Sequence, residues 1–241
     1  MSTREDWMRR LGPLYGGAVA LVHSTPWRWP DSIGNEARSG FWVVALGLPI
    51  GLVAWIAAAL IDAVGMPPSI GAIVGLAVLS LASAALVERG VVERIDGTHA
   101  SAPSVTSILV LVFGTLVRVA AITALPTSLW LGVFVTTALA GRWAAVFLQA
   151  LGDPILDDVS PRSLVATPTP AWLTAAITIG VLTIAVLALG KAGFVALALT
   201  AAIAFALGLD AQRRDRGLSA PVVATAAAIG ELAILLVATM T

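Results

Sequence analysis

Long apolar segments run through most of this chain and constrain its fold more than any other feature. A helix needs about 20 mainly apolar residues to cross a bilayer, and the sequence has seven such segments, separated by short connections rich in Pro and Gly. The predicted spans are residues 41–61, 69–87, 104–125, 129–151, 171–190, 192–209 and 219–240. We therefore expect an all-α fold, a polytopic transmembrane helical bundle.

The composition agrees with a chain surrounded by lipid. Hydrophobic residues make up 59% of it and charged residues 12%, whereas an ordinary soluble domain carries about 25% charged residues. The formal net charge is zero and Cys is absent, so neither a general attraction to nucleic acid nor a thiolate metal site is expected. We expect one membrane domain over 1–241, in which a cytosolic or interfacial segment, 1–40, precedes a transmembrane bundle, 41–241.

A short apolar run at 11–22 follows three arginines and has two interpretations. It resembles the core of a cleaved secretory signal. It is also short and interrupted by Pro13, and no small-residue cleavage site follows. A re-entrant or interfacial helix is the interpretation that we prefer.

The basic residues predict the orientation, because positive charge in short loops stays in the cytosol. With the N-terminus inside, eleven cations fall on the cytosolic side, only Lys191 falls outside, and Arg118 and Arg142 lie within spans. We expect an N-in, C-out protein of the cytoplasmic membrane that meets charged substrates from the cytosol. The eleven are Arg4, Arg9, Arg10, Arg28, Arg38, Arg89, Arg94, Arg162, Arg213, Arg214 and Arg216.

The densest polar stretch, 87–99, follows the second span. If it is helical, Arg89, Glu93 and Asp96 share one face. Acids at this spacing suit Mg²⁺ bridging a diphosphate, because hard cations prefer oxygen ligands. The alternative is a charged, solvated segment stabilised by Glu–Arg pairing. His99 alone is more typical of a polar loop residue than of a ligand.

Three ionisable residues lie within predicted spans, where each needs a partner or a cavity. At 1.5 Å per residue, Arg142, Glu231 and Arg118 lie roughly 14, 18 and 21 Å from the cytosolic ends of their spans. Arg142 could pair with Glu231, or it could face a phosphate at the floor of a cytosolic cavity. Arg118 is expected to snorkel or to pair structurally.

Two further charged groups have both a functional and a structural interpretation. Asp153, Asp157 and Asp158 follow the fourth span and could join a metal site, although a solvated acidic loop is the simpler interpretation. The arginines of 213–216 are most simply determinants of topology, with anionic lipid or nucleotide phosphate as secondary ligands.

The order of several motifs resembles the cobalamin synthase family, the adenosylcobinamide-GDP ribazoletransferases. Residues 38–42 and 46–52 resemble its first span, and Ala84 to Gly97 resembles its acidic signature. Gly141-Arg142-Trp143-Ala144 resembles its Arg-Trp-Ala motif, and 217–233 resembles its last cytosolic loop and final helix. The match runs in register over nearly the whole chain.

This resemblance implies a Mg²⁺-assisted membrane transferase of cobalamin biosynthesis that joins adenosylcobinamide-GDP to alpha-ribazole phosphate and releases GMP. The implied catalytic residues are Glu93, Asp96 and Arg142. The implied metal ligands are Glu88, Glu93 and Asp96, and the implied substrate contacts are Arg89, Arg142 and Ser219.

The chain departs from the family where the chemistry should lie. Val87 replaces a His, Arg89 replaces the first signature Asp, and Pro221 replaces the Asp of the last loop. A fixed cation at Arg89 opposes a second cation and weakens metal binding, although Glu88 could substitute for a lost ligand. One alternative is therefore a non-catalytic relative that acts as a scaffold or partner subunit, either as a homo-oligomer or beside an active synthase. A small-solute transporter is a weaker alternative, because the sequence lacks inverted repeats.

Overall fold

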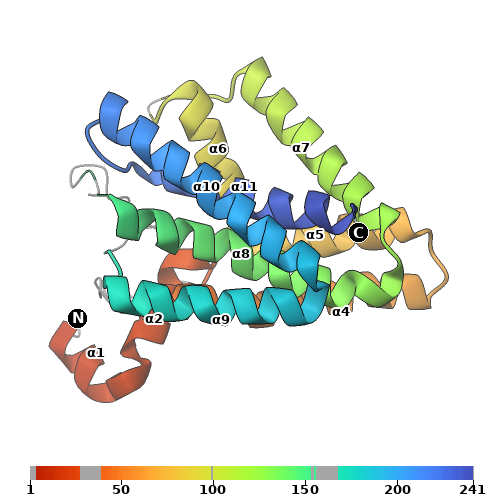
Figure 1. Ribbon diagram of the computed structural model, residues 1–241, viewed down its shortest axis with the longest axis horizontal. Coiled ribbons are helices and arrows are strands. Elements are labelled where there is room, and N and C mark those ends of the chain that lie inside the picture. Colours follow the sequence, from red (N-terminus) through yellow and green to blue (C-terminus); the bar gives the residue numbers. More distant parts are fainter. Residues whose placement is uncertain (1–3, 28–38, 99, 153–154, 156–167, 241) are drawn as a thin grey trace.

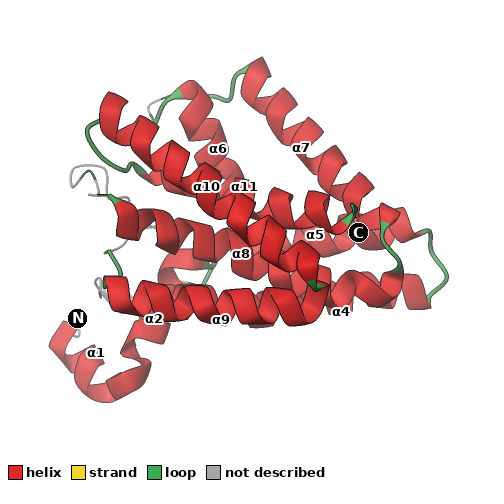
Figure 2. Cartoon of the chain, in the orientation of Figure 1, coloured by secondary structure: helices red, strands yellow, loops and turns green. Residues whose placement is uncertain are grey.

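In the computed structural model, every regular element in the described part of the chain is a helix (Figure 2). The structure describes residues 4–27, 39–98, 100–152, 155 and 168–240. The elements are α1 (Arg4–Leu11), η1 (Gly12–Leu14), α2 (Tyr15–Ser24), α3 (Ser39–Ala45), α4 (Gly47–Ala63), α5 (Pro68–Ala82), α6 (Leu86–Asp96), α7 (Val105–Ala124), η2 (Thr127–Leu129), α8 (Trp130–Leu151), α9 (Ala171–Leu189), α10 (Lys191–Arg214) and α11 (Ala220–Ala238).

Six of the helical segments are long and apolar enough to cross a membrane. They are Ser39–Ala63, which joins α3 and α4, Val105–Ala124, Thr127–Leu151, Ala171–Leu189, Lys191–Arg214 and Ala220–Ala238. The helices α5 and α6 together meet the same criteria but are bent by 78° at a short break. The expected helical bundle is confirmed as a helical fold, with six candidate spans, or seven if the bent pair is one span.

Two helices form the centre of the bundle. The helix α8 packs against α4, α9, α10 and α11, and α11 also packs against α6 and α10. Figure 1 shows α9 along one edge, with α6 and α7 along the opposite edge beyond α11. Most of α8 is buried, so its apolar side chains face protein on nearly all sides. The outer helices, α7 among them, carry the exposed apolar residues.

Small residues allow α8 and α11 to cross closely. A Cβ on Gly141 would lie 2.7 Å from Glu231 Cγ, and a Cβ on Gly230 would lie 2.9 Å from the Ala140 carbonyl oxygen. Close approach through glycine is a common way for membrane helices to pack. Each of these glycines immediately precedes an ionisable residue, Arg142 or Glu231, so the crossing brings both side chains into the interior.

The second predicted span, 69–87, was wrong in one respect, because the helix stops at Ala82. Ala84 and Ala85 have φ values of 54° and 51°, a left-handed conformation that ends a right-handed helix. The Ser83 hydroxyl donates to the Leu79 carbonyl oxygen at 2.9 Å. The chain then changes direction and continues as α6, which packs against α11. The charged segment therefore does not follow the axis of α5.

The N-terminal apolar run 11–22 forms helical structure, and its place at a membrane interface stays a prediction. It comprises η1 and α2, and α2 packs against α3. Tyr15, Val19 and Ala20 are buried there. The segment therefore belongs to the folded body in this structure.

Candidate functional site

Ionisable residues of four helices meet in the interior of the bundle. We call Ser83, Glu88, Arg118, Arg142 and Glu231 the buried polar cluster. Ser83 lies at the α5–α6 break and Glu88 in the first turn of α6, while the other three come from α7, α8 and α11. Glu88, Arg142 and Glu231 belong to the three separate sequence segments, 84–97, 141–144 and 217–233, that carry the family resemblance.

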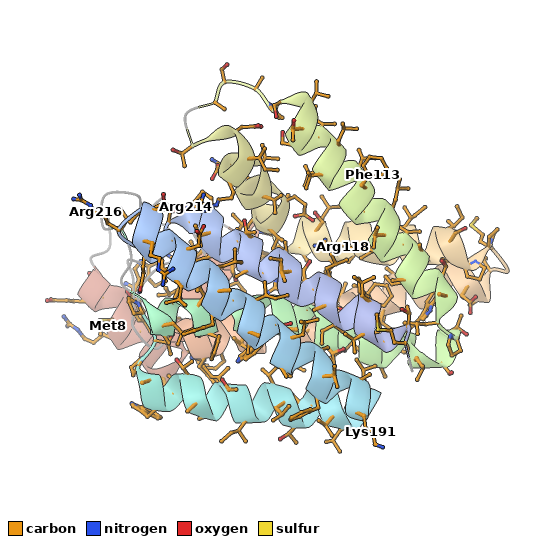
Figure 3. All side chains as sticks on the ribbon, turned by 45° about the horizontal axis from the view of Figure 1, so that its top comes forward. Met8, Phe113, Arg118, Lys191, Arg214 and Arg216 are labelled. Atoms are coloured by element: carbon orange, nitrogen blue, oxygen red, sulfur yellow. The ribbon has the colours of Figure 1, made fainter. Side chains whose placement is uncertain are left out.

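Arg118 is the central cation of the cluster. Its Nη2 lies 3.1 Å from Glu231 Oε2, and its Nη1 lies 4.0 Å from Glu88 Oε1. The same Nη2 also donates to the Ala228 carbonyl oxygen at 3.4 Å. The Arg118 side chain is 15% exposed and that of Glu231 only 5%. Figure 3 shows Arg118 on the side of α7 that faces the other helices. One guanidinium group therefore serves two carboxylates.

Arg142 has neutral partners instead. Its Nη2 donates to Ser83 Oγ at 2.8 Å, and its Nη1 donates to the Ala138 carbonyl oxygen at 3.4 Å. Arg142 and Glu231 line the same small hollow, yet the ion pair of Glu231 is with Arg118. The sequence-based pairing of Arg142 with Glu231 was therefore wrong, and the structural pairing expected of Arg118 is confirmed.

Two atoms of the cluster are buried without a hydrogen-bond partner among the described residues, Arg142 Nε and Glu88 Oε2. A buried polar atom without a partner costs free energy, so such atoms mark places where water or a ligand can bind. The two atoms differ in sign, because Arg142 Nε is a donor and Glu88 Oε2 is an acceptor.

Arg89 and Glu93 lie on the outer part of α6, away from the cluster. Arg89 Nε lies 2.6 Å from Glu93 Oε1, one turn along the helix, and the Arg89 side chain is 62% exposed. The helical form of this stretch is thus confirmed, and the contact is the Glu–Arg pair of the alternative interpretation. Exposed pairs of this kind contribute little to stability.

Asp96 accepts hydrogen bonds at the start of the next helix. Ser104 and Ser107 both donate to it through their hydroxyl groups, and the Ser104 backbone N–H also donates, at 2.9 Å. Asp96 ends α6, outside the six candidate spans, and bonds from the Ser104 side chain, the Ser104 N–H and the Ser107 side chain hold its pKa below the ordinary value. Asp96 therefore connects α6 to the N-terminus of α7.

The three carboxylates expected to bind Mg²⁺ do not fit a shared site in this arrangement. Glu88 lies beside Arg118, Glu93 beside Arg89, and Asp96 beside the two serines. Among the described residues, no three acidic or His side chains form a group that could hold a metal ion. Mg²⁺ binding stays a prediction to be tested in solution.

The remaining expected residues are placed as follows. Ser219 precedes α11, where its carbonyl oxygen accepts from the Val223 N–H at 3.3 Å, and its side chain makes no capping bond. Pro221 lies in the first turn of α11. Several residues named from the sequence lie outside the described part of the chain: Arg28, Arg38, His99, Asp153, Asp157, Asp158 and Arg162.

Sequence reasoning missed the serines that complete these contacts. Ser83 bonds Arg142, and Ser104 and Ser107 bond Asp96. A serine at the start of a helix is a recognisable capping signal, so Ser104 could have been identified. Ser83 has no comparable signal, because its role depends on the break that follows it.

Comparisons of the chain with protein-family models, with curated proteins and with solved structures find no match. The resemblance to the cobalamin synthases therefore stays a prediction that biochemistry can test.

Proposed function

We propose that this protein is a cobalamin synthase-like membrane transferase that joins adenosylcobinamide-GDP to alpha-ribazole phosphate with release of GMP. One observation carries the proposal. Glu88, Arg142 and Glu231, each from a different sequence segment that resembles the family, meet in the buried polar cluster. These segments are expected to meet if they form one site. Their separation along the sequence does not by itself bring them together.

Arg142 is the residue that we assign to the substrate. Its guanidinium is buried, its Nε–H has no protein partner among the described residues, and its other contacts are to neutral oxygens. A guanidinium whose hydrogen bonds go to neutral oxygens can also donate to a phosphate oxygen. The proposal assigns no step to Mg²⁺, because the three expected carboxylates have separate partners.

The test is formation of a cobalamin product by the purified protein in lipid nanodiscs, with and without Mg²⁺. A synthase with intact motifs serves as the positive control. We expect turnover by the wild type and loss of turnover in Arg142→Met, while Arg9→Met, which changes an exposed arginine of α1, should retain it. Glu93→Ala tests the acid implied by the resemblance.

A non-catalytic partner subunit is the second candidate, and a specific observation favours it. Glu93 is engaged by Arg89, and Asp96 by Ser104 and Ser107, so two of the expected catalytic acids have protein partners. If the folded protein fails to turn over beside a working control, this candidate is preferred. Co-purification with a motif-intact synthase, and a change in the activity of that synthase, would then support it.

A further inference from the structure

A crevice of about 210 Å³ opens between α6, α7 and α11. Its walls are mainly apolar and include Val91 of α6, Val110 and Leu111 of α7, and Ile229 and Leu232 of α11. Glu88 and Arg118 also line it, so the crevice reaches the buried polar cluster. A concave apolar site with a few polar groups is typical of small-molecule binding.

One carboxylate next to this crevice has an incomplete set of hydrogen bonds. Arg118 is the cation shared by Glu88 and Glu231, and it lies much closer to Glu231, at 3.1 Å, than to Glu88, at 4.0 Å. Arg142 donates to Ser83 and to a backbone carbonyl. Glu88 Oε2 is buried and has no hydrogen-bond partner among the described residues. Glu88 is therefore a carboxylate with one oxygen that lacks a hydrogen-bond donor among the described residues.

We propose that the crevice binds a small hydrophobic amine, with its apolar body against the walls and its ammonium group beside Glu88. Burial of the body removes apolar surface from water, and a charge-assisted bond from the ammonium supplies the Glu88 carboxylate, which borders the crevice, with a further donor. Hydrophobic anions are disfavoured, because Arg118 already serves two carboxylates. The volume suits a molecule of about nine to fifteen non-hydrogen atoms and not a two-chain lipid. This binding does not depend on the proposed transfer reaction.

The probe is 2-phenylethylamine, and its neutral isostere propylbenzene is the ligand control. Binding to the full-length protein in phosphatidylcholine nanodiscs is measured by titration calorimetry, with empty nanodiscs subtracted. We expect the amine to bind and Glu88→Gln to weaken its binding by at least tenfold. The affinity for propylbenzene should be the same in the wild type and in Glu88→Gln. Glu93→Gln, which changes an acid outside the crevice, should bind the amine as the wild type does.

A second variant blocks the crevice without touching a charge. Gly114 lines the crevice, and a Cβ built on it meets no atom within 4 Å, so Gly114→Leu should fill the space without a clash and abolish amine binding. Gly180 of α9 also has open space around it and lies in a different pocket. Gly180→Leu is therefore the matched control and should retain binding.

The inference is overturned if the wild type does not bind the amine. It is also overturned if Gly114→Leu binds as tightly as the wild type, or if propylbenzene binds as tightly as the amine and Glu88→Gln leaves both unchanged. If Glu88→Gln does not fold, amine binding by Gly114→Leu is the result that tests the proposal. The assay contains neither corrinoid nor nucleotide, so its result is separate from that of the transferase assay.

Discussion

Two alanines at the α5–α6 break have a backbone conformation that favours glycine. Ala84 and Ala85 both have positive φ, and the left-handed region costs a non-glycine residue about 1–2 kcal/mol. Because glycine adopts this conformation without a Cβ penalty, we expect Ala84→Gly to stabilise the protein by about 1 kcal/mol. Thermal unfolding in detergent measures the effect.

The matched control is Ala77→Gly, an exposed position inside α5. There the same change should destabilise the protein by about 0.5–1 kcal/mol, because glycine weakens a helix interior. If both variants lose stability, the left-handed conformation at Ala84 is not the one the protein adopts.

The Arg118–Glu231 ion pair makes a second prediction at the scale of single residues. Arg118→Met leaves Glu231 buried without its cation, which should cost about 3–5 kcal/mol. The double variant Arg118→Met, Glu231→Leu removes both charges and should recover most of that loss. A double-mutant cycle on unfolding free energies measures the coupling. Additive effects of the two single changes would contradict the pairing.

Sequence identified the ionisable residues of the interior but not their partners. Arg118 and Arg142 both lie at depths that suit Glu231, so the rise per residue alone could not choose between them. The choice depends on which side each helix presents to α11. For α8 that orientation depends on the close packing at Gly141 and Gly230, which is a property of the assembled bundle.

At the scale of elements, the hydropathy pattern predicted most helices closely. The expected spans at 104–125, 171–190 and 219–240 correspond to α7, α9 and α11 within a few residues. The break after Ala82 was missed because alanine has the highest helix propensity, so a run of Ser and Ala gives no stop signal. The chain changes direction between α5 and α6. The charged residues of 88–96 are consistent with this change, because charged side chains are unfavourable in the hydrocarbon core.

The α8–α11 crossing gives a prediction at the scale of two elements. A Cβ at Gly230 lies 2.9 Å from the Ala140 carbonyl oxygen, so Gly230→Val must push the two helices apart. We expect a loss of about 1–3 kcal/mol in unfolding free energy. Gly180→Val, where the surroundings are open, should have a much smaller effect. Equal losses in the two variants would show that the crossing is not closely packed.

At the scale of the whole molecule, the charged residues gather at opposite ends of the helices. Figure 3 shows Arg214 and Arg216 at one end and Lys191 at the other. At the same end as Arg214, Arg94 of α6 lies 3.0 Å from Asp215 and 3.8 Å from Asp210. This distribution fits the orientation predicted from the positive-inside rule, with the Arg214 end in the cytosol.

Because the chain has no Cys, single substitutions can test this orientation directly. In intact cells, Lys191→Cys should react with a membrane-impermeant maleimide, whereas Arg214→Cys should react only after the membrane is permeabilised. Labelling in unfolded, solubilised protein controls for the reactivity of each thiol. The opposite labelling pattern would show that the orientation is the reverse of the predicted one. Labelling of both thiols in intact cells would show that the two ends do not lie on opposite sides of the membrane.

The break in the second membrane segment has a consequence for how the protein is made. The helix α5 has 15 residues, about 22 Å of helix, which is shorter than the roughly 30 Å hydrocarbon core of a bilayer. Its continuation, α6, packs against α11, which is synthesised more than 100 residues later than α6. We therefore expect α5 and α6 to remain incompletely packed until α11 has been synthesised, so that the nascent chain depends on the insertion machinery to shield them from water.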